Sequence, residues 1–308
     1  MPPRHVLAAV GVMVVWGMNF VVIEKGLVGV PPLVFVALRF MVVLLALPFV
    51  ARPDVPWRHL LAVGTAMSLG QFALLYSAIA VGMPPGLASL VLQVQAIITV
   101  VLAALVLGER PLPVQVGGVV LGLVGLAVVA LGRGGRVPAV ALVLAVAAAA
   151  SWAVGNVLVR RLALPGGLGV TVWSAVVVPL PLLALALVVD GPARVSHALT
   201  HLSAANLLST AYTAVLASLV GYGVWNWLLG RYAASTVAPF TLLVPVVGIA
   251  TAWLVNGERP NGFGALGGAL LVLGVAAVAL GPRLGVSRAR SAGSGAAAGA
   301  PPAGLGRQ

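Results

Sequence analysis

The sequence predicts an all-α membrane protein with ten transmembrane helices, arranged as two inverted five-helix repeats. Three observations carry this prediction. The chain of 308 residues is 61% hydrophobic and only 7% charged, with a mean hydropathy of +1.16. Ten apolar runs are long enough to cross a bilayer, and one stretch of sequence occurs twice. Since a soluble domain is about a quarter charged, most of the apolar surface must face lipid.

A transmembrane helix needs about 20 apolar residues to span the hydrocarbon core. The ten runs that reach this length are residues 5–24, 32–51, 59–81, 85–107, 113–132, 138–159, 169–189, 204–229, 234–256 and 262–281. The first run follows Arg4, as in a signal peptide. It is longer than the roughly 7–15 apolar residues of a cleaved signal, and no small-residue cleavage site follows it. We therefore expect it to be the first transmembrane helix.

The duplicated stretch begins with Gly-Glu-Arg-Pro and ends with Ala-Leu-Gly. Residues 108–132 and 257–281 share 12 identities in 25 positions without a gap. Duplicated sets of membrane helices are typical of secondary transporters, in which two halves move about a central site. Because each repeat has five helices, the second must enter the membrane from the opposite side. We expect the repeats to be 1–132 and 133–281.

Positive charges set the expected orientation, since cytoplasmic loops carry an excess of arginine and lysine. With the N-terminus inside, the inner segments hold 11 such residues and the outer loops hold 5. Four of the 11 lie in residues 282–308, a stretch rich in Gly, Ala, Ser and Pro that we expect to be a disordered cytoplasmic tail. The prediction is a multi-pass protein of a bacterial inner membrane with both termini in the cytoplasm.

The same composition argues against several function classes. The net charge of +12 is spread between apolar runs, which indicates contact with membrane lipids rather than nucleic acid. The chain has no cysteine and no Gly-x-x-x-x-Gly-Lys-Ser/Thr loop for ATP. Its four histidines stand at loops or span edges, without acids at metal-ligand spacing. We expect no enzyme activity, no metal and no cofactor.

Polar groups inside a span are costly, so each one is a candidate for function. Trp16 and Asn19 share one face of the first helix, and Trp152 and Asn156 share one face of the sixth, its counterpart in the second repeat. Matching faces in both repeats favour a pseudo-symmetric cavity for a solute. The alternative is packing, in which each asparagine bonds a neighbouring helix and an adjacent glycine allows close approach.

Arg39 is the one ionisable residue deep inside an expected span. We expect it to attract a substrate carboxylate. The alternative is that it snorkels to the membrane surface or pairs with helix-end carbonyls or a loop acid. Glu24, Glu109 and Glu258 all stand at helix ends, where capping or surface pairing is the simpler interpretation.

Three other helices complete the candidate site. The third carries a polar stripe that ends at Gln71. In the fourth, Gln93 and Gln95 point to nearly opposite sides, so one is expected to line the cavity and the other to bond across an interface. Tyr222 lies well inside the eighth helix. The expected substrate-binding residues are Trp16, Asn19, Arg39, Gln71, Gln93, Trp152, Asn156 and Tyr222.

Several stretches resemble the EamA family of the drug/metabolite transporter superfamily. They are 14–23 (VVWGMNFVVI), 31–40 (PPLVFVALRF), 86–96 (GLASLVLQVQA), 221–226 (GYGVWN), 228–232 (LLGRY) and 237–248 (VAPFTLLVPVVG). The resemblance covers about residues 5–282. It implies ten helices, two five-helix repeats and export of small, amino-acid-like metabolites. One departure is Glu24, which stands where relatives often have lysine, with Lys25 next to it.

We therefore expect a secondary transporter that exports a small amino-acid metabolite, such as cysteine or O-acetylserine, by alternating access. Asparagine, glutamine and tyrosine would hydrogen-bond the solute, and tryptophan would pack its apolar part. The alternatives are an exporter of another solute class, such as a drug-like cation, and a membrane scaffold without transport. The solute, the coupling ion and the oligomeric state stay open at this point.

Overall fold

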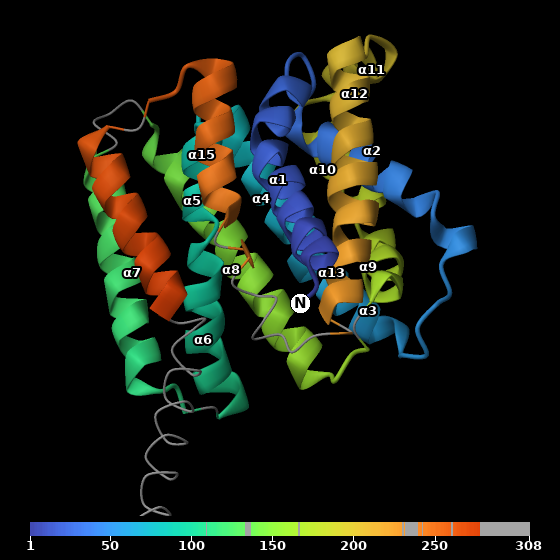
Figure 1. The fold of residues 1–308 in the computed structure, drawn as a ribbon. Helices are drawn as coiled ribbons and strands as arrows, with labels where there is room; N and C mark the ends of the chain where they lie inside the picture. Colours follow the sequence, from blue (N-terminus) through green and yellow to red (C-terminus); the bar gives the residue numbers. More distant parts are fainter. Residues whose placement is uncertain are drawn as a thin grey trace, which may run out of the picture.

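The structure, a computed structural model, describes residues 1–108, 110–132, 137–165, 167–229, 231, 240–241, 243–259 and 261–277. These residues form a bundle of helices side by side, with no strand among them (Figure 1). The predicted disordered tail, 282–308, lies outside the described residues, as does Glu109.

Seven helical runs are long and apolar enough to cross a membrane, judged by length and composition. They are Pro3–Gly26, Pro32–Phe49, Trp57–Ala80, Pro85–Leu107, Ala139–Arg161, Leu168–Val189 and Ala204–Trp225. Three apolar helices of the described residues are shorter: Pro113–Val129, Leu243–Asn256 and Gly262–Ala277. The predicted all-α membrane architecture is thus confirmed.

Several of the expected runs are divided into shorter elements. Before residue 133 the order is α1 (Pro3–Gly26), α2 (Pro32–Leu44), η1 (Leu47–Phe49), α3 (Trp57–Gly64), η2 (Thr65–Gly70), α4 (Gln71–Ala80), α5 (Pro85–Val91), α6 (Val94–Leu107) and α7 (Pro113–Gly132). After it the order is α8 (Ala139–Arg161), α9 (Leu168–Ser174), η3 (Ala175–Val177), α10 (Pro179–Val189), α11 (Pro192–Thr200), α12 (Ala204–Ala211), η4 (Tyr212–Val220), α13 (Gly221–Leu229) and α15 (Leu243–Asn256). We call these two groups the first and second halves.

Helical interruptions occur in both halves. The third span of each half contains a π-helical stretch, η2 in the first and η4 in the second. In the second span of the second half, η3 precedes Pro179, whose ring nitrogen cannot donate a helical hydrogen bond. The fourth span of the first half tightens between α5 and α6, where the N–H groups of Gln93, Gln95 and Ala96 donate to carbonyls three residues back instead of four. Such interruptions are frequent at functional sites in membrane helices.

The duplicated Gly-Glu-Arg-Pro motif marks two helix ends. Gly108 ends α6 and Gly257 follows α15, both with left-handed backbone (φ 68° and 71°). Only glycine takes this conformation at little cost, so it terminates each helix. The shared glycine is therefore explained by helix capping.

The two halves are packed into each other. α1 packs against α15 and along α12, η4 and α13 of the second half, while α8 packs against α6 and along η2 and α4 of the first. Glycine allows both contacts: a methyl group at Gly17 would overlap Val247 on α15, and one at Gly155 would overlap Met67 on η2. α7 and the helix at 262–277 lie together at one edge of the bundle, with glycines at their contact (Figure 1).

Candidate functional site

Arg39 lies inside the bundle, with 2% of its surface exposed. Its Nη1 donates to the Tyr76 hydroxyl at 2.8 Å, and its Nε and Nη2 both donate to the Ser218 hydroxyl, at 3.2 and 2.9 Å. The guanidinium also lies over the Phe72 ring, 3.9 Å from its centroid. The structure thus places Arg39 in the packed interior, and not at the membrane surface as the snorkelling alternative required.

The partners of Arg39 are neutral. The ion pairs among the described residues involve Lys25 with Glu24 and Arg194 with Asp190, not Arg39. Burying an unpaired charge is expensive, so an intramembrane cation of this kind is by default a functional-site candidate. Hydroxyl oxygens and an aromatic face lower that cost but leave the net positive charge in place.

An aromatic cluster stands beside this network. Trp16 packs against Tyr222 and Trp225, with ring centroids 5.3 and 5.5 Å apart, and its Nε1 donates to the Ala217 carbonyl at 2.9 Å. Ala217 stands directly before Ser218, which accepts from Arg39, so the aromatic cluster lies beside the network of the cation. The structure therefore brings three of the predicted residues, Trp16, Arg39 and Tyr222, into one region.

Two predicted amides are buried with unused hydrogen-bonding capacity. Gln71 is 1% exposed, and neither its Nε2 nor its Oε1 has a partner in the protein. Asn19 is 7% exposed, and its Oδ1 is unpartnered as well. Buried polar atoms are almost always satisfied, so each such atom calls for a water or a ligand group.

The remaining predicted residues make contacts between helices. Gln93 Nε2 donates to the Thr241 carbonyl at 3.1 Å. Asn156 Nδ2 donates to Gln95 Oε1 at 3.2 Å and to Thr99 Oγ1 at 3.3 Å. Both glutamines of the fourth span, Gln93 and Gln95, thus bond to other helices. The structure therefore does not distinguish one of them as the residue that lines the cavity. Trp152, one turn before Asn156, is partly buried against the core.

Sequence reasoning did not select Tyr76 and Ser218, although both touch Arg39. A usable signal was present. An arginine inside a span needs acceptors from neighbouring helices, and Tyr76 stands one turn after Phe72 on the third span. Ser218 could not be linked to Arg39 from the sequence, because 179 residues separate the two.

Two hollows at the surface contain none of the eight predicted residues. One, of about 460 Å³, lies beside the α1–α2 loop and α11, with Leu27, Val30 and His197 in its wall. A smaller one, of about 120 Å³, lies near Arg110 and Arg160. Of the predicted residues, Asn19, Arg39, Gln71 and Gln93 are buried, whereas Trp16, Trp152, Asn156 and Tyr222 are partly exposed.

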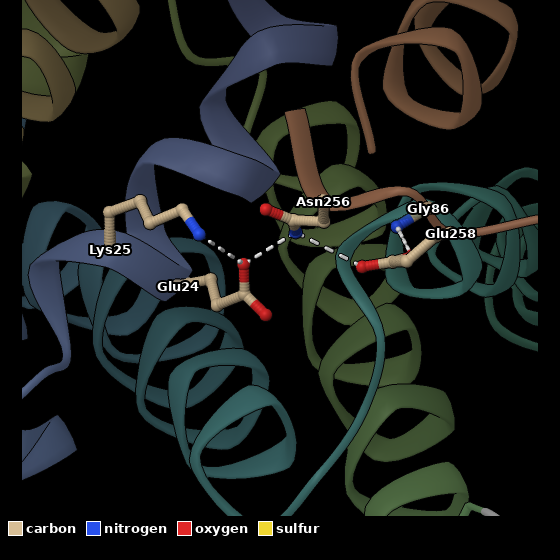
Figure 2. Close-up of polar contacts among 5 residues, drawn as sticks. All are labelled: Glu24, Lys25, Gly86, Asn256 and Glu258. Carbon is tan, nitrogen blue, oxygen red and sulfur yellow. Dashed lines mark hydrogen bonds and ion pairs between the residues drawn. The ribbon is translucent and has the colours of Figure 1, made fainter. Parts of the chain in front are cut away.

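A second polar group joins the halves at one end of the bundle (Figure 2). Asn256 Nδ2, at the end of α15, donates to Glu24 Oε2 at 2.6 Å and to Glu258 Oε1 at 3.1 Å. Lys25 Nζ lies 3.8 Å from Glu24, and the Gly86 backbone donates to Glu258 at 3.4 Å. One amide thus bridges two carboxylates from opposite halves, so Glu24 and Glu258 are not simply surface charges.

A bundle of apolar helices that encloses a buried cation and unpaired amides defines a polytopic membrane transport protein. The EamA-like transporter family matches the chain over residues 4–131 and over residues 139–280. The chain belongs to this family, and it is a transporter rather than an enzyme.

Curated relatives agree with this assignment. The chain is 44% identical over 271 residues to a "Probable amino-acid metabolite efflux pump" of Escherichia coli (strain K12), covering 86% of this chain and 91% of that one. It is 30% identical over 285 residues to a "Probable terminal-alkyne amino-acid exporter" of Streptantibioticus cattleyicolor, covering 88% and 92%. A protein crystal structure at 23% identity shares the fold, with a TM-score of 0.63 over 92% of this chain and 99% of that one.

Proposed function

We propose that this protein exports small amino-acid metabolites, of the cysteine or O-acetylserine kind, from the bacterial cytoplasm. The names of two relatives, a metabolite efflux pump and an amino-acid exporter, support this solute class. The buried charge is positive, which suits a solute with a carboxylate and disfavours a drug-like cation.

The proposed mechanism is alternating access by two inverted five-helix repeats. The reciprocal packing of α1 on α15 and of α8 on α6 supports it, as do the π-helical stretches in the third span of each half. The two matches of the family, to residues 4–131 and 139–280, have similar lengths. Rocking of such repeats about a shared site opens it to each side in turn.

The single observation that carries the proposal is Gln71, whose whole amide group is buried and unpartnered. Gln71 begins α4, the helix whose Tyr76 hydroxyl accepts a hydrogen bond from Arg39. We propose that Gln71 and Asn19 bond the polar groups of the solute and that Trp16 and Tyr222 pack its apolar part. Gln93, Trp152 and Asn156 complete the proposed site.

The test is uptake of labelled amino acids into inside-out membrane vesicles, where export from the cytoplasm appears as accumulation. We expect cysteine and O-acetylserine to accumulate, and Gln71→Leu to reduce their uptake at least roughly tenfold at unchanged protein level. Ser196→Ala, on the exposed face of α11, is the matched surface control. Accumulation of a cationic drug instead of amino acids would overturn the proposed solute class.

A further inference from the structure

We propose that Arg39, Tyr76 and Ser218 form the binding site for the carboxylate of the solute, with the two hydroxyl residues holding the guanidinium in position. This inference rests on the proposed function and deepens it, because it assigns one chemical group of the solute to one place. It also adds two residues, from opposite halves, to the site. The starting point is the imbalance of charge at Arg39, which has neutral partners only.

The hydrogen-bonding capacity of the guanidinium is only partly used. A guanidinium carries five N–H bonds: one on Nε and two on each Nη nitrogen. The contacts to Tyr76 and Ser218 occupy one N–H on each of the three nitrogens. One N–H thus remains on Nη1 and one on Nη2. These two donors equal in number the two oxygens of a carboxylate.

The Ser218 hydroxyl is itself anchored within η4. Ser218 Oγ donates to the Thr213 carbonyl at 2.9 Å, so its oxygen is left to accept from Arg39. Thr213 Oγ1 in turn donates to the Thr210 carbonyl at 3.0 Å, which ties down the segment that holds Ser218. The Tyr76 hydroxyl oxygen accepts from Nη1 of Arg39 at 2.8 Å. Both hydroxyl oxygens are therefore acceptors for the guanidinium.

This arrangement positions Arg39 without neutralising it. Ser218 belongs to a π-helical stretch of the second half, whereas Tyr76 belongs to α4 of the first half. Phe72 covers one face of the guanidinium and excludes water there. In such a low-dielectric setting an ion pair with a carboxylate is stronger than in water. The two neutral hydroxyl groups hold the guanidinium in place and leave its positive charge free to bind a carboxylate reversibly.

The test compares ligands that differ only in this group. The Kd values of O-acetylserine and of its carboxamide are measured by titration calorimetry on the purified full-length protein, and transport of both is measured in proteoliposomes. We expect Tyr76→Phe and Ser218→Ala each to raise the Kd for O-acetylserine roughly 10-fold, as expected for loss of a hydrogen bond to a charged group. In the same variants the Kd for the carboxamide should change less than about 2-fold. Arg39→Gln should make the Kd values of O-acetylserine and its carboxamide nearly equal.

Matched controls come from hydroxyls that bond elsewhere. Tyr212 donates to the Val15 carbonyl at 2.9 Å and Ser151 to the Ala66 carbonyl at 2.7 Å, so Tyr212→Phe and Ser151→Ala remove the same groups away from Arg39. We expect neither control to change the ratio of the two Kd values. Ser218→Thr keeps the hydroxyl and should bind O-acetylserine more tightly than Ser218→Ala does. This pair of variants tests the site even if Tyr76→Phe does not fold.

The outcomes separate this inference from the proposed export. Equal weakening of both ligands, the same shift in the controls, or no shift in Tyr76→Phe and Ser218→Ala would each overturn the carboxylate site. Failure of the wild type to bind O-acetylserine, cysteine and acetate would overturn it too. If the carboxylate-specific pattern appears but proteoliposomes show no flux, the binding site stands and the proposed export is wrong.

Discussion

Gln93 and Thr241, 148 residues apart in the chain, join the fourth span of one half to the corresponding segment of the other. Gln93 stands where the fourth span tightens between α5 and α6, and its Nε2 donates to the carbonyl of Thr241, shortly before α15 begins. A side chain of one half thus bonds a backbone acceptor of the other half. The contact joins the tightened turn of the fourth span to the residues just before α15.

The first prediction concerns this link. Gln93→Leu should leave the Thr241 carbonyl without this partner and lower the free energy of unfolding by about 1–2 kcal/mol. Thermal unfolding of the purified protein measures the loss. Gln93→Glu, which keeps the size but cannot donate from a charged carboxylate, should be at least as destabilising. If both variants melt like the wild type, the Gln93–Thr241 contact does not hold the halves together.

The second prediction tests the inverted topology. Arg110 and Arg259 are exposed and follow the glycines that end α6 and α15. Single cysteines in their place should react with a membrane-impermeant maleimide from opposite sides, Arg259→Cys in intact spheroplasts and Arg110→Cys only in inside-out vesicles. The unmodified chain has no cysteine and gives no background. Labelling of both from one side contradicts the inverted repeats.

The third prediction separates solute contacts from packing among buried asparagines. Asn19→Ala and Asn156→Ala should lower transport while expression stays near normal, because an intramembrane hydrogen bond contributes only about 0.6 kcal/mol on average. Transport into vesicles and the yield of folded protein are measured together.

Asn206→Ala provides the contrast. Asn206 caps α12 with Ser203 and also donates to the Gly26 and Val28 carbonyls, at 2.9 and 3.0 Å. Its loss should reduce stability by about 1–3 kcal/mol, a defect in folding rather than in solute binding. If Asn19→Ala and Asn156→Ala show the same folding defect at full specific activity, they are packing residues.

The fourth prediction concerns the amide between two carboxylates (Figure 2). Asn256→Asp would replace the donor shared by Glu24 and Glu258 with a third negative charge. Repulsion and the lost bonds should lower the free energy of unfolding by about 1–3 kcal/mol near pH 7.5. The defect should be smaller at pH 4.5 than at pH 7.5, because repulsion among three neighbouring carboxylates favours the uptake of a proton.

Asn256→Ala is the control for charge. It removes the same bonds without adding a carboxylate, so its defect should change much less with pH. Melting temperatures of both variants across pH 4.5–7.5 decide the matter. If the melting temperatures of the two variants change with pH in the same way, a charge at position 256 does not repel Glu24 and Glu258.

The sequence by itself determined the class of protein and much of its outline. Apolar runs must face lipid, and backbone groups inside a membrane must bond within a helix, so composition and run length were enough to predict an all-helical membrane protein. The repeated Gly-Glu-Arg-Pro motif marked two helix ends correctly, since glycine is the residue that tolerates the left-handed turn there. The mid-span position of Arg39 indicated a buried cation, because a charge is costly inside a membrane and must be placed within the protein.

Only the tertiary structure decided what surrounds each polar residue. Which side chains reach Arg39 depends on how α2, α4 and η4 pack, and Ser218 lies 179 residues away in the chain. Helical periodicity gives the face of a residue but not the neighbour opposite it, so Gln95 as the partner of Asn156 and Asn256 as the bridge between Glu24 and Glu258 were out of reach. The π-helical stretches were also hidden, because their extra residue per turn is set by packing between the halves and leaves no mark in composition.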